Sequence, residues 1–477
     1  MSEQRKTDRP APLVHAPRAD RRRVLLTAAT MPPMGTTALH YGDLRPPMGL
    51  GFIASFLERH GHEVRICDNY LAPLSMESEI EEFRPDIMGL YMHTPGYYMA
   101  CDLIDELKQI APEVPLVAGG PHASLLPHNV PAGVDYVCTG EGEHVMLDLA
   151  EGWRPTERVI DNAKTQRIKE LDDYPFPNYD HFVDKAYNWG FDIYGRSESP
   201  VFTMHTSRSC PYRCTFCGVA AIWTRKWTAF SADRIVEEID AYVERYGCQG
   251  VYFREDLFTT DLRRVERMCD LLIERPYDVV WACESRADIT SERVLEKMAR
   301  SGCIGLYCGI ESGSTSGLKK KKKDLTPETM RIFFTLAKKF SINVYATLCM
   351  GTPTETEEEL AETEEFLAEV EPFAVDRFAF LAQPRSEDSE YVERNKLFYH
   401  KDSAGILYTD RFREMSQRLY PPDDQRLYFL EQQRQFLEEN RGRLSEAELA
   451  AHRFSPMPSE LADAATSSTE NEFRQNL

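Results

Sequence analysis

Short apolar runs alternate with amphipathic stretches in two series along this chain, and this alternation restricts the possible folds more than any other feature. Near-continuous apolar strands that alternate with helices are typical of a parallel sheet with both faces covered. The first series has strand-like runs at 24–30, 63–68, 86–92, 115–120 and 135–140. We therefore expect an α/β chain that begins with a Rossmann-like, doubly wound parallel sheet over residues 21–152.

The second series begins at residue 201 and repeats the same alternation. Its strand-like runs are 201–204, 250–256, 279–285, 304–312, 342–351 and 375–381. Six such units predict a partial (β/α)6, TIM-like barrel over residues 201–385, with its chemistry at the carboxyl ends of the strands. A pattern of helical spacing then predicts a helical C-terminal region over 386–455.

The segments around the two series have the composition of linkers and tails. Residues 153–200 contain Tyr174-Pro175-Phe176-Pro177, and prolines this close are incompatible with a helix or a central strand. We predict a connector between the two domains there; alternatively, its part 186–200 covers the active site. The polar ends, 1–20 and 456–477, are predicted to be disordered.

Charge and cysteine usage restrict the partners and the compartment. The formal net charge of −21 disfavours nucleic acid as a partner, and no apolar run reaches the roughly 18 residues of a membrane span. The 12 cysteines lack the regular spacing of a disulfide framework, which indicates reduced thiols and a cytoplasmic location.

Three cysteines follow the first strand of the second series. Cys210, Cys214 and Cys217 form the pattern C-x3-C-x2-C, with Phe216 directly before the last of them. Four-iron clusters are normally held by four thiolates, so three thiolates leave one iron open for a small molecule. The alternatives are a zinc site with His205 as the fourth ligand, or a chance grouping of cysteines.

The cysteine spacing resembles the cluster loop of the radical S-adenosylmethionine superfamily. The resemblance implies that Cys210, Cys214 and Cys217 hold a [4Fe-4S] cluster whose open iron chelates S-adenosylmethionine. In that family an electron from the cluster cleaves this cofactor to a 5′-deoxyadenosyl radical, which takes a hydrogen atom from an unactivated C–H bond. The electron donor is expected to be a small carrier such as flavodoxin.

Several strand ends of the second series resemble the S-adenosylmethionine contacts of that family. Arg254-Glu255-Asp256 occupies the place of the acidic motif that holds the ammonium group, and which acid makes the contact stays open. Arg286 suits bidentate pairing with the carboxylate. The full set that the resemblance places around this cofactor is Phe216, Glu255, Asp256, Glu284, Arg286, Glu311, Ser312 and Gly351.

The first domain resembles the cobalamin-binding domain fused to many radical S-adenosylmethionine enzymes. The likeness rests on residues 45–64 and on the GGPHAS and TGEGE turns. It implies cobalamin contacts from Gly119, Gly120, His122, Thr139, Gly140 and Glu141. The D-x-H-x-x-G motif, whose histidine binds cobalt, is absent. The alternative is a domain of this type that binds nothing and only packs on the barrel.

Five consecutive lysines, Lys319 to Lys323, lie between a strand end and a helix start. We predict a solvated loop; the alternative is a docking site for the acidic electron carrier.

Together the patterns predict a radical S-adenosylmethionine enzyme with three possible outcomes. The first is cobalamin-dependent methylation of an unactivated carbon in a small metabolite. The second keeps the radical but ends in dehydration, cyclisation or rearrangement, for example of an amino sugar. The third is a non-catalytic iron–sulfur or cobalamin carrier, which would have no use for the acids and arginine at the strand ends. No catalytic proton donor or acceptor is identified.

Overall fold

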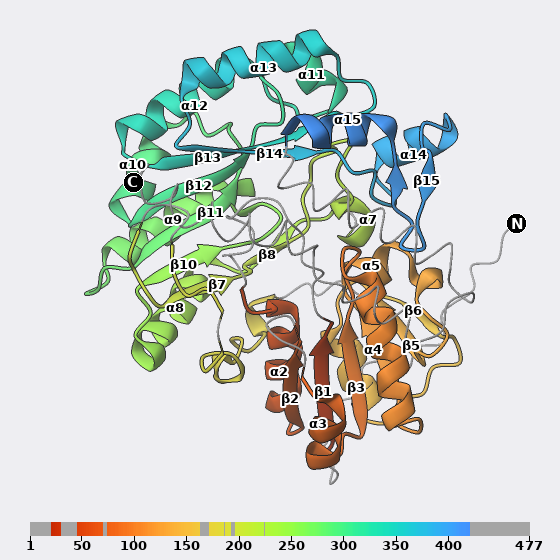
Figure 1. Cartoon of the computed structure of the whole chain (residues 1–477). Coiled ribbons are helices and arrows are strands. Elements are labelled where there is room, and N and C mark those ends of the chain that lie inside the picture. The colour runs from red at the N-terminus through yellow and green to blue at the C-terminus, as the bar shows by residue number, and fades with distance from the viewer. Residues whose placement is uncertain are drawn as a thin grey trace, which may run out of the picture.

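The computed structural model confirms an α/β fold with two parallel sheets (Figure 1). It describes residues 21–29, 45–69, 74–162, 171–185, 187–191, 196–223 and 225–419. The predicted disordered ends, 1–20 and 456–477, and the predicted helices of 420–455 lie outside the described residues. Among the described helices, none combines the length and the apolar content that a membrane crossing requires.

The first sheet has six strands in the order β2-β1-β3-β4-β5-β6, all parallel. Because β1 is an inner strand with β2 on one side and β3 on the other, the sheet is doubly wound, as predicted. Its strands are β1 (Arg23–Ala28), β2 (Glu63–Asp68), β3 (Ile87–Tyr91), β4 (Leu116–Gly119), β5 (Tyr136–Thr139) and β6 (Val159–Asp161). Its helices are α2 (Met48–Arg59), α3 (Met76–Phe83), α4 (Tyr97–Ile110), α5 (Pro121–Leu125) and α6 (Glu143–Ala150).

Strand β6 lies within the segment that the sequence predicts as a linker. It pairs with β5 in parallel and extends the first sheet by one strand. Three residues are too few to show an apolar period, so only the pairing with β5 defines this strand. Part of the described connector packs against the second sheet: Tyr179 is fully buried, and its ring centre lies 4.7 Å from that of Phe202 on β7 (Val201–Met204).

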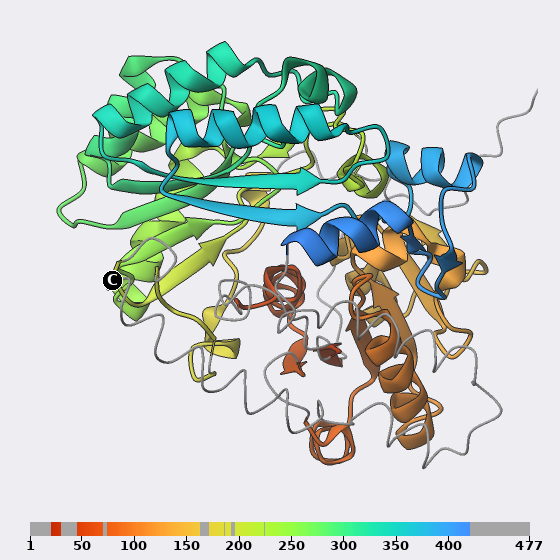
Figure 2. The same ribbon diagram turned by 45° about the horizontal axis from the view of Figure 1, so that its top comes forward.

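The second sheet also has six parallel strands, but its order follows the chain: β7-β10-β11-β12-β13-β14. Its helices cover one face of the curved sheet, as expected for a partial barrel (Figure 2). The remaining strands are β10 (Gly250–Phe253), β11 (Val280–Ser285), β12 (Cys303–Gly309), β13 (Asn343–Met350) and β14 (Ala374–Ala379). The helices are α8 (Ala232–Tyr246), α9 (Leu262–Ile273), α10 (Glu292–Arg300), α11 (Thr315–Lys320), α12 (Pro327–Lys339) and α13 (Glu357–Val370).

The cysteine loop has short elements of its own. A two-stranded ribbon, β8 (Ser207–Arg208) with β9 (Thr228–Ala229), begins and closes it, and α7 (Val219–Trp223) follows the last cysteine. Ser231 caps α8 and Thr326 caps α12, since each side chain accepts a hydrogen bond from the backbone N–H three residues later.

The C-terminal region is only partly helical, which corrects the prediction for residues 386–419. Between α14 (Glu387–Arg394) and α15 (Asp410–Leu419), strands β15 (His400–Lys401) and β16 (Leu407–Tyr408) form an antiparallel hairpin. Strands of two residues are too short to give a periodic signal. The hairpin turn reaches the first domain, where Asn129 donates to the Ser403 carbonyl at 2.6 Å, and α15 packs along β14 (Figure 2).

Candidate active site between the two sheets

A cavity of about 400 Å³ lies where the carboxyl ends of both sheets meet. From the first domain it is lined by the turns after β4 and β5 and by residues of β1, β3 and α2. From the second domain it is lined by residues that follow β7 and β10 and by the end of β11. Its glycine and charged or polar lining includes Gly49, Gly89, Gly119, Gly120, Ser124, Gly140, Glu141, Gly142, Glu143, His205, Ser207, Arg208, Arg254, Glu255, Asp256 and Glu284. Ligands of open parallel sheets bind at this edge.

Glycines give the first-domain wall of the cavity a bare backbone. Gly120 has φ +94°, and a Cβ there would lie 2.8 Å from the Met92 carbonyl oxygen, so no other residue fits without a shift of the chain. Gly140 has φ +74°, and its N–H donates to Ser124 Oγ at 3.0 Å. A flat ligand can therefore approach the main chain of both turns.

Two of the six predicted cobalamin residues do not line the cavity. His122 is fully buried, its ring centre lies 4.7 Å from that of Tyr97, and burial lowers its pKa to about 4. Thr139 is also buried, and its hydroxyl donates toward the Asp161 carboxylate at 3.2 Å. Both side chains hold the turns in shape. Gly119, Gly120, Gly140 and Glu141 do line the cavity.

Arg208 of β8 joins the two domains at the edge of the cavity. Its guanidinium lies 3.0 Å from Glu141 Oε1 and 2.6 Å from Glu143 Oε1; the two carboxylates are buried, and the Arg208 side chain is 12% exposed. Burial alone would lower the pKa of Arg208, but the carboxylates of Glu143 and Glu141 raise it above its ordinary value. The residue that leads into the cysteine loop is thus fixed to the turn after β5.

Glu255 and Asp256 shape the start of the cysteine loop. Glu255 Oε2 accepts the N–H groups of Thr206 and of Ser207, the latter at 2.6 Å, while Oε1 accepts the Thr206 hydroxyl at 3.1 Å. Asp256 Oδ2 accepts the N–H of Ser209 at 3.0 Å, and Ser209 has φ +77°. The acidic motif therefore holds the backbone that leads to Cys210 and also lines the cavity.

The three cysteines lie half-buried in the loop after this anchor. Burial raises the pKa of Cys210 and raises that of Cys217 to about 12. Thiols in such surroundings become thiolates when a positive metal centre binds them. Three sulfur donors in one short loop fit an iron–sulfur centre by the chemistry of the donor set.

The zinc alternative has no geometric support. Among the described residues, no three His, Cys, Asp or Glu side chains converge in the way that a single metal ion requires. His205 lines the cavity, whereas the three cysteines are not part of its lining. Burial, with the charges of Arg254 and Arg208, lowers the pKa of His205 to about 4.

Of the remaining residues predicted around S-adenosylmethionine, Glu284 lines the cavity and accepts the Tyr252 hydroxyl at 2.7 Å. Arg286 is buried; its guanidinium lies 3.6 Å from the ring centre of Tyr212 and donates to Asp288 and to the Lys323 carbonyl. Because Tyr212 lies between the first two cysteines, Arg286 holds the cysteine loop.

The other predicted contacts lie outside the cavity lining. Phe216 packs against the hydrophobic cluster of Phe380, Ala382, Val392 and Leu407. Glu311 Oε2 accepts the Cys349 N–H at 2.8 Å, and the fully buried Ser312 is 3.1 Å from the Thr363 hydroxyl. Gly351 faces α15, where a Cβ would lie 3.1 Å from Met415.

Family models match both halves of the chain. A model described as B12 binding domain matches residues 36–150, and a model described as Radical SAM superfamily matches residues 204–367. This chain belongs to the radical S-adenosylmethionine superfamily, in the group with an N-terminal B12-binding domain. Membership implies a [4Fe-4S] cluster and S-adenosylmethionine, and the first domain implies cobalamin.

Relatives with the same arrangement support this assignment. An uncharacterised methyltransferase of Pyrococcus horikoshii is 29% identical over 340 residues, which cover 67% of this chain and 72% of the relative. An anaerobic magnesium-protoporphyrin IX monomethyl ester cyclase of Rubrivivax gelatinosus is 24% identical, over 66% of this chain and 60% of the relative. The solved radical enzyme OxsB with aqua-cobalamin bound shares the fold, with a TM-score of 0.67, 17% identity and coverage of 82% and 64%.

The lysine run departs from its predicted role as a solvated loop. Lys319, Lys320 and Lys322 are exposed, but Lys321 and Lys323 are only 1% and 6% exposed. The run ends α11 and turns beneath the cysteine loop, so the prediction is wrong for these two residues. Composition alone cannot reveal this, because burying a lysine requires acceptors supplied by distant segments.

Proposed function

We propose that this protein is a cobalamin-dependent radical S-adenosylmethionine methyltransferase that acts on an unactivated carbon of a small molecule. One observation carries the proposal: a single cavity is lined by the glycine turns of the B12-binding domain and by the acidic strand ends of the radical domain. Two cofactors held at these walls would meet in one volume. The relative named as a methyltransferase supports the same outcome.

We assign the roles of the chain's residues from their contacts. Cys210, Cys214 and Cys217 would hold the cluster. Because Glu255 already accepts three hydrogen bonds from residues 206–207, we assign the ammonium of S-adenosylmethionine to Asp256 and Glu284, which also line the cavity. When bound, the cluster and S-adenosylmethionine supply a 5′-deoxyadenosyl radical, and cobalamin carries the methyl group.

The glycine turns and Arg208 complete the proposed site. Gly119, Gly120 and Gly140 would let the corrin approach the main chain, since none of them projects a side chain into the cavity. Arg208 would keep this wall at a fixed distance from the cysteine loop through Glu141 and Glu143. In the cell, a small carrier such as flavodoxin would supply the electron.

A second outcome is favoured by one relative. The Rubrivivax protein is named a cyclase, so ring closure without methyl transfer is compatible with this combination of domains. The fold and the first radical step are the same in both cases. Only the fate of the substrate radical differs.

Product analysis tests the proposal and separates the two outcomes. The reconstituted protein is incubated without oxygen with methyl-deuterated S-adenosylmethionine and dithionite, with and without cobalamin. We expect 5′-deoxyadenosine in both samples and S-adenosylhomocysteine only with cobalamin. If 5′-deoxyadenosine forms but cobalamin produces no S-adenosylhomocysteine, methyl transfer is contradicted and the second outcome is favoured.

A matched pair of cysteine variants tests the cluster assignment. Cys214→Ala should abolish both products and most of the bound iron. Cys269→Ala removes a thiol from the core side of α9, away from the loop, and should retain iron and products. Retention of products in the Cys214 variant would refute the assignment.

A further inference from the structure

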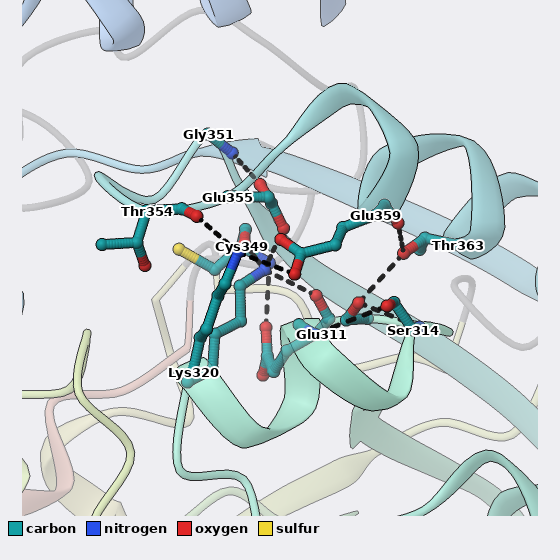
Figure 3. A network of polar contacts seen from close by, with 12 residues as sticks. Glu311, Ser314, Lys320, Cys349, Gly351, Thr354, Glu355, Glu359 and Thr363 are labelled. Atoms are coloured by element: carbon teal, nitrogen blue, oxygen red, sulfur yellow. Dashed lines mark hydrogen bonds and ion pairs between the residues drawn. The ribbon is translucent and has the colours of Figure 1, made fainter.

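Two buried ammonium groups lie in the turn after α11, and their hydrogen bonds differ. Lys321 Nζ donates to the Glu311 carbonyl at 2.8 Å, the Cys349 carbonyl at 2.7 Å and Glu355 Oε1 at 2.5 Å. Figure 3 shows Glu311, Cys349 and Glu355 converging from neighbouring elements. An ammonium has three N–H groups, so Lys321 is fully satisfied and its role is to hold the turn.

Lys323 is buried with two donors to spare. Its side chain is 8% exposed, and among the described residues its Nζ has one hydrogen-bond acceptor, Glu311 Oε1 at 3.1 Å. A buried cation with unmade hydrogen bonds is costly. Two N–H groups of this ammonium can therefore donate to a further anionic acceptor.

The turn that carries Lys323 lies against the cysteine loop. Thr215 donates its N–H to the Lys321 carbonyl at 3.1 Å, and the Lys323 Nζ lies 6.0 Å from the ring centre of Phe216. Arg286 contacts Tyr212 and donates to the Lys323 carbonyl, which ties the two segments together a second time. The anion nearest to this ammonium, apart from Glu311, is thus expected within residues 212–217.

The ammonium keeps its charge in this position. Burial alone would lower the pKa of Lys323, but the carboxylate of Glu311 and the sulfur of Cys214 raise it above its ordinary value. Because the site is buried, water screens this charge less than it would at the surface.

We propose that the Lys323 ammonium donates hydrogen bonds to the anionic centre held at Cys214 and raises its reduction potential. The inference rests on the proposed iron–sulfur cluster. Adding an electron makes such a centre more negative, and a nearby buried cation with free N–H groups stabilises that state; hydrogen bonds to the sulfurs and local net charge are known determinants of cluster potential. Glu311 partly offsets the cation, since it lies on the other side of the same ammonium.

The test is a redox titration of the reconstituted full chain, followed by electron paramagnetic resonance, without S-adenosylmethionine. We expect Lys323→Gln to lower the equilibrium constant for reduction at least tenfold, about 59 mV for one electron. Lys323→Arg keeps the charge and should remain near the unmodified protein. Lys322→Gln is the matched control: Lys322 is exposed and pairs with Glu387 at 2.6 Å, so its loss should leave the potential unchanged.

Each outcome bears on the proposal. An unchanged reduction potential in Lys323→Gln would overturn it. If that variant also bound S-adenosylmethionine more weakly, the ammonium would be assigned to the carboxylate of that ligand. If Lys323→Gln fails to hold iron, Glu311→Gln serves instead: it removes the opposing charge, and a potential that did not rise would overturn the proposal. If the unmodified chain gave no four-iron spectrum, the proposed function itself would fail.

Discussion

His122 is a single residue whose burial predicts a measurable response to pH. Burial lowers its pKa to about 4, whereas an exposed histidine has about 6.5, so the unfolded chain takes up the proton first as the pH falls. The stabilisation is complete above about pH 6.5 and is lost as the pH falls toward 4. Between pH 7 and pH 5 we expect this residue to lower the free energy of unfolding by at most about 2 kcal/mol.

Urea unfolding at pH 7, 6 and 5 measures this effect. His122→Leu should remove its share of the slope with pH. His128→Leu is the control, because that side chain is exposed on the neighbouring turn. An identical slope in both variants would contradict the assignment of the slope to His122.

Arg208 joins the two domains through ion pairs with Glu141 and Glu143. Arg208→Met would leave Glu141 and Glu143 buried without this cation, and removing one partner of a buried ion pair typically costs about 3–5 kcal/mol. Arg331→Met breaks an exposed pair with Glu369 and should cost less than about 1 kcal/mol. Urea unfolding measures the free energy of unfolding of both variants. Equal losses of this free energy would contradict a larger contribution from the Arg208 ion pairs than from the exposed pair.

Residue roles were predictable from the sequence only where they depend on local spacing. Cys210, Cys214 and Cys217 are recognisable because one loop supplies all three. Arg208 gave no signal, since its partners come from the other domain, 65 residues earlier in the chain for Glu143. Glu311 and Ser312 were assigned by their place at a strand end, yet their side chains bond to β13 and α13 instead.

At the scale of elements, the turn after β4 depends on a glycine. Gly120→Ala would place a Cβ 2.8 Å from the Met92 carbonyl in a left-handed backbone, so the turn must move away from the cavity. We expect weaker cobalamin binding, measured by equilibrium dialysis. Gly61→Ala imposes a similar φ with nothing within 4 Å, so it should lower stability by about 1 kcal/mol and leave binding intact. If both variants bound cobalamin as tightly as the unmodified protein, the proposed role of the turn after β4 in binding cobalamin would be refuted.

Periodicity identified the long elements and missed the short ones. The twelve strands of the two sheets include eleven that the sequence predicts, and the exception, β6, has three residues. The sequence did not predict the β15–β16 hairpin either, because its strands have only two residues each. The burial of Lys321 and Lys323 was not predicted for a different reason. A charged side chain is expected to be exposed unless carbonyl and carboxylate groups from distant parts of the chain accept its hydrogen bonds, and those contacts are tertiary.

At the scale of the whole molecule, the cavity exists because two sheets present their carboxyl ends to each other. Neither domain lines it alone: Gly120 and Glu141 come from one, His205 and Glu284 from the other. The sequence predicts each set of strand ends but not their separation, which is set by packing of the connector around Tyr179 and by Arg208. The order of the domains was therefore predictable, and the shared volume was not.

The central claim is that three cysteines leave one iron of a four-iron cluster open to S-adenosylmethionine. Mössbauer spectroscopy of chain reconstituted with ⁵⁷Fe, before and after that ligand is added, tests it most directly. The account predicts about four irons per chain, with one of them changing its spectrum on binding. Four irons that are indifferent to the ligand, or zinc in place of iron, would contradict it.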